Sequence, residues 1–500
     1  MILDQYSALD HHPAMGKALN AFQAPWIREE DRRRLTAYMI LDSYSRNRAG
    51  ALATEYGNDF SNLREYGDAG LIVSQLVSSV LGDSQDVECE DEGALEFLRE
   101  WMERENFLLS MMSAERDCVA LGDAVWVLRW DGSRPRVSRI DPGFYFPVLD
   151  DSLHGDPFPR KVHLAWEFEE DGRRKLRRIT YEMVPTGAVK YPWNEGVSHE
   201  ECVMSDLVWD LTDMTRVDAL SDSRAIPRVD DSGREIVRYP LGIDFIPVVH
   251  MPNAATGEHF GESSLSRVVQ VLDDLAAADT DATAASGTTG TPMLVMKGAG
   301  GSAFGRNEYR VEPGFVFTVG EQGDVRAIDT SAQLQEMRER VRDLQRRVAR
   351  SARVPEVALG GWGSDLALSG VALQIQYGPL SNAVRELRLA RRSKYALLFK
   401  FVQRMAMLGG RKELPVFATL AFGEFMPKDV SGIVDWVSRA VEGGVLSVGS
   451  AVDVLRSSGV SVAADEAALL RSVDFDGAVR LGDATGDLGR VLEYLDGEAL

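Results

Sequence analysis

The chain has 500 residues, of which 45% are hydrophobic and 26% are charged, and its formal net charge is −22. A chain of this length exceeds what one hydrophobic core normally organises, so two to four structural regions are expected. The acidic excess excludes a protein that grips nucleic acid with its whole surface, because phosphate neutralisation needs clustered Lys and Arg. It still permits a protein past which DNA slides without being held.

Neither membrane insertion nor a metal site is indicated by the residue pattern. No stretch approaches the roughly 18 uninterrupted apolar residues of a membrane span, and the amino terminus does not read as a secretion signal. The three cysteines, Cys89, Cys118 and Cys202, are widely spaced, which favours free thiols in a reducing compartment. Because no Cys or His spacing is typical of zinc ligation, we expect no metal and no other cofactor.

The first 120 residues or so favour helices, as the spacing of Ile72, Leu76 and Val80 indicates. Two strand pairs follow. One turns at Asp131-Gly132, and the other turns at Asp171-Gly172. Basic residues crowd the second turn and could touch phosphate, but a solvated flank that faces neighbouring acids is the favoured interpretation; they are Arg173, Arg174, Lys175, Arg177 and Arg178.

Two helices with narrow apolar seams are predicted at 262–287 and 331–353, on either side of a short β-rich segment at 288–330. In each helix the apolar residues recur at alternating intervals of three and four, a pattern that helices use to pack against other helices. The seam residues are Leu265, Val268, Leu272 and Leu275 in the first helix, and Leu334, Met337, Val341, Leu344 and Val348 in the second.

A glycine-bearing loop at 354–369 separates the second seamed helix from a very long predicted helix at 370–410. That helix contains Pro379, a probable kink, and Gly409-Gly410 would end it. Residues 411–500 are predicted to form mostly short helices. The fold class is therefore α+β.

Catalytic motifs are absent from the sequence. The segment 298–306, GAGGSAFGR, follows a predicted strand, but Ala303 stands where a dinucleotide fingerprint needs glycine and no helix follows. There is no phosphate-binding GxxxxGK[ST] and no GxSxG nucleophile elbow. We therefore do not expect an enzyme.

The order of these features resembles the portal proteins of tailed bacteriophages, the ring-shaped head-to-tail connectors through which DNA enters and leaves the capsid. The phrase IPVVHMPN followed by GESSLSRVVQVLDDLAAADTD resembles the start of the family's first stem helix, and SGVALQ at 369–374 resembles the start of its long helix. The likeness covers most of the chain, from about Tyr38 to Leu481.

The resemblance implies a portal fold with the following regions: an amino-terminal wing at 1–261, stem helices at 262–287 and 331–353, a clip at 288–330, a tunnel loop at 354–369, a long wing helix at 370–410 and a helical crown at 411–500. The tunnel-loop residues at the DNA channel would be Leu359, Gly360, Gly361, Trp362, Gly363 and Ser364. For Trp362 the alternative is an anchor packed against the long helix.

The partners that the resemblance implies are a homo-oligomeric, dodecameric ring, the double-stranded DNA that passes through it, the terminase large subunit, the major capsid and scaffolding proteins, and a head-tail adaptor. No membrane partner is implied. The expected location is the capsid vertex of the virion at the head-tail junction, and the host cytoplasm during assembly. The alternatives are a portal of a gene transfer agent or domesticated prophage, and an uncharacterised oligomeric enzyme.

Overall fold

The computed structural model describes residues 29–50, 67–149, 158–194, 196–211, 224–230, 232–254, 259–290, 294–297, 324–327, 331–360, 370–411, 414, 416–426, 430–443 and 445–457. The chain divides into two compact units. Unit 1 comprises Met1–Ala367 and Ile375–Phe425, and unit 2 comprises Leu368–Gln374 and Met426–Leu500. The α+β class is confirmed.

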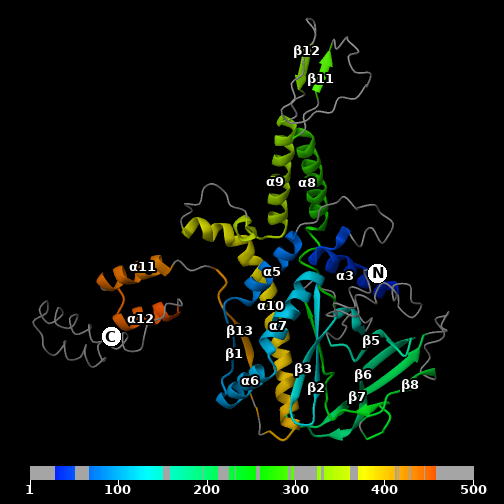
Figure 1. The fold of residues 1–500 in the computed structure, drawn as a ribbon. Helices are drawn as coiled ribbons and strands as arrows, with labels where there is room; N and C mark the ends of the chain where they lie inside the picture. The colour runs from blue at the N-terminus through cyan, green and yellow to red at the C-terminus, as the bar shows by residue number, and fades with distance from the viewer. Residues whose placement is uncertain are drawn as a thin grey trace, which may run out of the picture. The chain divides into compact units, whose positions relative to one another are not determined.

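The core of unit 1 forms where four helices meet a three-stranded antiparallel sheet (Figure 1). Its helices are α3 (Glu29–Ser45), α5 (Asp68–Leu81), α6 (Glu92–Arg104) and α7 (Phe107–Leu121). The sheet has the order β10 (Val248–Pro252), β2 (Asp123–Trp130), β3 (Pro135–Ile140). The predicted helical start and the first strand pair are thus confirmed, but Leu71, which the spacing groups with Ile72, Leu76 and Val80, is exposed.

A six-stranded antiparallel sheet forms the second layer. Its order is β4 (Tyr145–Val148), β5 (Lys161–Glu170), β6 (Arg173–Val189), β7 (Ser198–Asp210) and β8 (Ile226–Pro227), with β9 (Tyr239–Pro240) also paired to β7. β5 and β6 join through Asp171 and Gly172, both at positive φ, as the Asp-Gly turn predicts. The region from Trp193 to Gly242 is polar, and its sequence predicts an irregular structure with some strand; it contains the long strand β7.

The basic residues at the β5–β6 turn are paired with acids, as predicted. Arg174 lies 3.3 Å from Glu167, and Lys175 lies 2.7 Å from Glu170. Arg177 reaches Asp206 on β7 at 2.6 Å, a partner that the sequence did not suggest. These side chains are therefore neutralised within the sheet.

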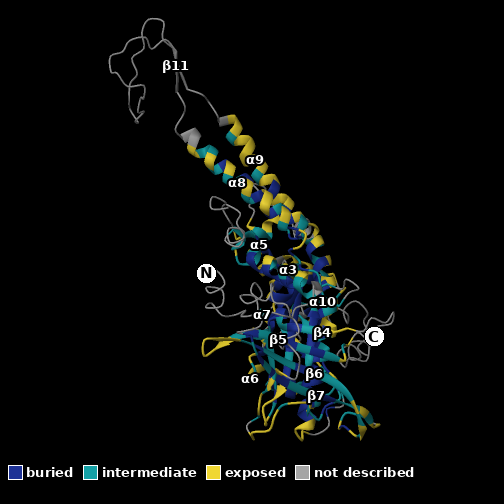
Figure 2. Ribbon diagram, turned by 90° about the vertical axis from the view of Figure 1, so that its right-hand side faces the viewer, coloured by how far each residue is buried: buried dark blue, intermediate teal, exposed yellow. Residues whose placement is uncertain are grey.

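A two-helix hairpin, α8 (Val269–Gly290) and α9 (Ser331–Ser351), extends from this body (Figures 1 and 2). The strands β11 (Leu294–Lys297) and β12 (Asp324–Ala327) lie beyond its far end (Figure 1). The one-turn helix η4 (Glu356–Leu359) follows α9, and α10 (Gly370–Leu408) then runs through the body. The segment 298–306 and four of the predicted tunnel-loop residues, Gly361, Trp362, Gly363 and Ser364, lie outside the described residues.

The strand pair β1 (Gln85–Glu88) and β13 (Thr419–Phe422) completes unit 1, and it was not expected from the sequence. Unit 2 contains the helices α11 (Val430–Glu442) and α12 (Val448–Ser457), as predicted, with Val437 and Val452 buried. Within the described ranges no helix is long and apolar enough to cross a membrane.

Candidate functional site

The first helix of the hairpin, α8, begins later than the sequence predicted, at Val269 rather than at residue 262. The reason is a set of hydrogen bonds to the end of α7. The Ser263 hydroxyl donates to the Ala120 carbonyl (2.6 Å), and the Ser264 amide donates to the Val119 carbonyl (3.0 Å). These bonds hold the segment in turns, so the seam residues Leu265 and Val268 are fully buried in the body rather than in the hairpin.

The remaining seam residues lie between the two helices of the hairpin. Leu272 and Leu275 of α8 are buried. On α9, Val348 is 2% exposed and Leu344 is 8% exposed, whereas Met337, farther from the body, is 36% exposed. Val341 and Leu334 are partly buried. The seam therefore packs within one chain, most tightly near the body (Figure 2).

The base of the hairpin is tied to the body by polar contacts. The Tyr44 hydroxyl of α3 donates to Asp273 Oδ1 of α8 at 2.5 Å. At the end of α9, Arg353 pairs with Glu386 of α10 at 3.0 Å. The hairpin is thus anchored to the body at the start of α8 and just after the end of α9.

Two of the predicted tunnel-loop residues are described. Leu359 ends η4 and is partly buried against the core, and Gly360 follows in the left-handed conformation at φ 82°. The left-handed region suits glycine, which pays no steric penalty there. Their contact with DNA stays a prediction.

The helix α10 is fixed in the body by a buried polar network that the sequence did not reveal. Arg391 donates to Glu115 Oε2 of α7 (3.0 Å) and to Asn253 Oδ1 after β10 (2.7 Å). Tyr395 donates to the other oxygen of Glu115 (2.9 Å). Burial, and then the charge of Glu115, raises the pKa of the Tyr395 hydroxyl well above its ordinary value.

A second polar cluster centres on Asp123 at the start of β2. It accepts hydrogen bonds from the Tyr38 hydroxyl (2.5 Å) and the Gly261 amide (2.8 Å), and its Oδ1 lies 2.7 Å from His250 Nε2. His259 stacks on His250 with ring centroids 4.6 Å apart. Burial, and then the neighbouring His250, lowers the pKa of His259 to about 3. No group of metal-binding side chains gathers anywhere among the described residues.

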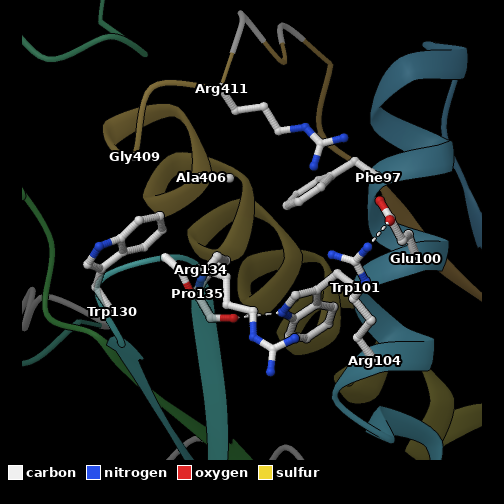
Figure 3. Close-up of a pocket in the computed structure, with 11 residues that line it drawn as sticks. Phe97, Glu100, Trp101, Arg104, Trp130, Arg134, Pro135, Ala406, Gly409 and Arg411 are labelled. Atoms are coloured by element: carbon white, nitrogen blue, oxygen red, sulfur yellow. Dashed lines mark hydrogen bonds and ion pairs between the residues drawn. The ribbon is translucent and has the colours of Figure 1, made fainter.

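A cavity of about 160 Å³ opens between α6, the β2–β3 turn and the end of α10 (Figure 3). The Trp101 indole donates to the Pro135 carbonyl (2.9 Å), and the Arg411 guanidinium lies 4.3 Å from the centroid of Phe97. The cavity lining presents aromatic faces and three guanidinium groups, but Arg104 is paired with Glu100 and Arg134 with Glu105.

The hairpin carries opposite charges on its two helices. The charged side chains of α8 are all acidic: Asp273, Asp274, Asp279 and Asp281. Arginines outnumber acids on α9, and its arginines are Arg338, Arg340, Arg342, Arg346, Arg347 and Arg350. All six arginines are exposed, as are Asp273, Asp274 and Asp281.

Comparison with known proteins gives weak structural likeness only. No family model matches the chain, and no curated protein matches it. Two solved structures are similar to it at 12% identity. A chain in the virion of a native gene transfer agent particle gives a TM-score of 0.37, over 81% of this chain and 89% of that chain. A chain in the neck of a native gene transfer agent particle, computed with C12 symmetry, gives 0.38, over 79% and 90%. Scores at this level define neither a shared fold nor a shared role.

Proposed function

We propose that this chain is a portal protein, one subunit of a ring at a capsid vertex that forms a channel for double-stranded DNA. In this proposal the body and α10 form the wing, α8 and α9 form the stem, and the β11–β12 end is the clip that meets the terminase and later a head-tail adaptor. Residues 411–500, which include α11 and α12, form the crown. The ring acts mechanically, without catalysing a reaction itself.

The observation that carries the proposal is the α8–α9 hairpin. Its apolar seam is satisfied within one chain, yet its outer faces carry rows of exposed charge and its far half is supported by no other described element. A long helical projection of this kind gains support when copies stand side by side around an axis. The order of hairpin, loop and long helix matches the resemblance in the sequence.

The charge balance also supports a channel. A net charge of −22 keeps the surface as a whole from holding DNA, because each phosphate bound during passage slows translocation. The arginines of α9 are the exception in this region, and a subunit contact would neutralise them without involving DNA.

Electron microscopy of the purified full-length chain tests the proposal. We expect closed rings of about twelve copies with a central hole. A compact monomer under all conditions of concentration and salt would contradict it.

A further inference from the structure

Two exposed arginines on one flank of α9 form no ion pair within the part of the chain that the structure describes. Arg338 and Arg342 lie one turn apart, and no ion pair joins either of them to any described residue. Arg346 continues the row toward the body but already pairs with Asp343 at 3.2 Å. We call Arg338 and Arg342 the arginine row.

Two exposed aspartates on α8 likewise form no ion pair with a described residue. Asp274 and Asp281 are seven residues apart, which places them on one face about 10 Å from each other along the helix. We call these two residues the acidic row.

The two rows point to opposite sides of the hairpin. At about 100° per residue, the acidic row lies roughly a quarter turn from Leu275, and the arginine row lies roughly a quarter turn from the α9 seam. The two quarter turns have opposite senses, because the angle decreases from the α8 seam to the acidic row and increases from the α9 seam to the arginine row. Since the helices run in opposite directions with their seams facing each other, turns of opposite sense lead to opposite faces. Counted from the helix ends at Gly290 and Ser331, Asp281 stands between the levels of Arg338 and Arg342.

We infer that the arginine row of one copy docks on the acidic row of the next copy around the ring. Rows of opposite charge on opposite faces, whose heights overlap at Asp281, fit a head-to-tail contact between identical chains and cannot satisfy each other within one chain. The contact also sets the register, because stacking α9 directly on α9 would bring arginines together. This inference rests on the proposed ring and names the surfaces that close it.

Charge reversal tests the pairing. Variant A carries Arg338→Asp with Arg342→Asp, and variant B carries Asp274→Arg with Asp281→Arg. Each alone faces like charge with like charge, so we expect at least about a tenfold loss of rings by electron microscopy and light scattering. Mixed A and B restore rings in which the two variants alternate, and so does the chain that carries all four changes.

A matched control changes the same charge elsewhere. Arg116→Asp with Arg228→Asp alters two exposed arginines of the body and should leave rings unchanged. Rings from A or B alone at wild-type yield would overturn the inference while leaving the ring intact. Failure of the mixture and of the four-change chain, with helix content unchanged by circular dichroism, would also overturn it. A wild-type chain that forms no ring contradicts the proposed function itself.

Discussion

Arg391 of α10 and Glu115 of α7 form an ion pair in which both side chains are 0% exposed, with Nε and Oε2 3.0 Å apart. The pair joins the long helix to the helix that precedes the central sheet. Since α10 also leads back to the proposed tunnel loop, this contact fixes the element on which the loop depends.

Replacing Glu115 with Gln should destabilise unit 1 by about 3–5 kcal/mol, because it leaves the buried Arg391 charge without its counter-ion. Urea unfolding followed by circular dichroism measures the loss. Arg99→Ala is the control, because the Arg99–Asp86 pair is more than half exposed on both sides and solvent screening leaves it little effect on stability. Equal losses of unfolding free energy in the two variants would show that the buried pair stabilises the fold no more than the exposed pair does.

Gly122→Ala should be strongly destabilising. Gly122 ends α7 at φ 107°, and an added Cβ would stand 2.7 Å from the Gly261 carbonyl oxygen. Gly132 has a similar φ of 89° but open space around it, so Gly132→Ala reports the backbone penalty alone, about 1–2 kcal/mol. Unfolding free energies should separate the two variants, and similar values would exclude the close approach as a cause.

Leu344→Asp should disrupt the hairpin, because a carboxylate would enter the buried seam of α9 without a partner. Combined with Val341→Asp, it should also prevent ring assembly. Met337→Asp, on the same face but 36% exposed, should have little effect. Helix content and thermal unfolding provide the measurement. Normal rings from the double variant would exclude the seam from assembly.

Asp42 on α3 predicts a pH dependence. Burial raises its pKa to about 6, and its Oδ2 has no hydrogen-bond partner among the described residues. The folded state thus binds the proton more tightly than the unfolded state. This contribution is complete below about pH 4 and disappears as the pH rises to about 6, a difference on the order of 3 kcal/mol.

Asp42→Asn should remove this dependence. Comparing the free energies of unfolding of wild type and variant at pH 4 and pH 7 isolates the contribution from other groups. A wild-type minus variant difference that stays constant between the two pH values would refute the raised pKa.

Deleting residues 359–363 should leave rings intact but impair packaging or retention of DNA, because the deletion shortens the proposed tunnel loop without touching the hairpin. Counting filled heads by electron microscopy gives the readout. Heads filled as in wild type would remove the loop from the mechanism, whereas loss of the rings themselves would assign it a structural role.

The sequence by itself determined most of the elements. Periodicity located α9, α10 and the helices of unit 2, and the Asp-Gly turns located two strand pairs, because these signals are local. Local signals also identified the seam residues, since Leu272 and Leu275 on α8, and Leu344 with its neighbours on α9, recur at helical spacing.

Only the tertiary structure decided what those elements touch. It delayed the start of α8 through bonds from Ser263 and Ser264 to α7, and it paired β1 with β13 across more than 300 residues. It also placed Arg391 beside Glu115, and the residue pattern of neither helix predicts this ion pair. Contacts between residues far apart in the chain depend on how whole elements pack, and no local residue pattern records that packing.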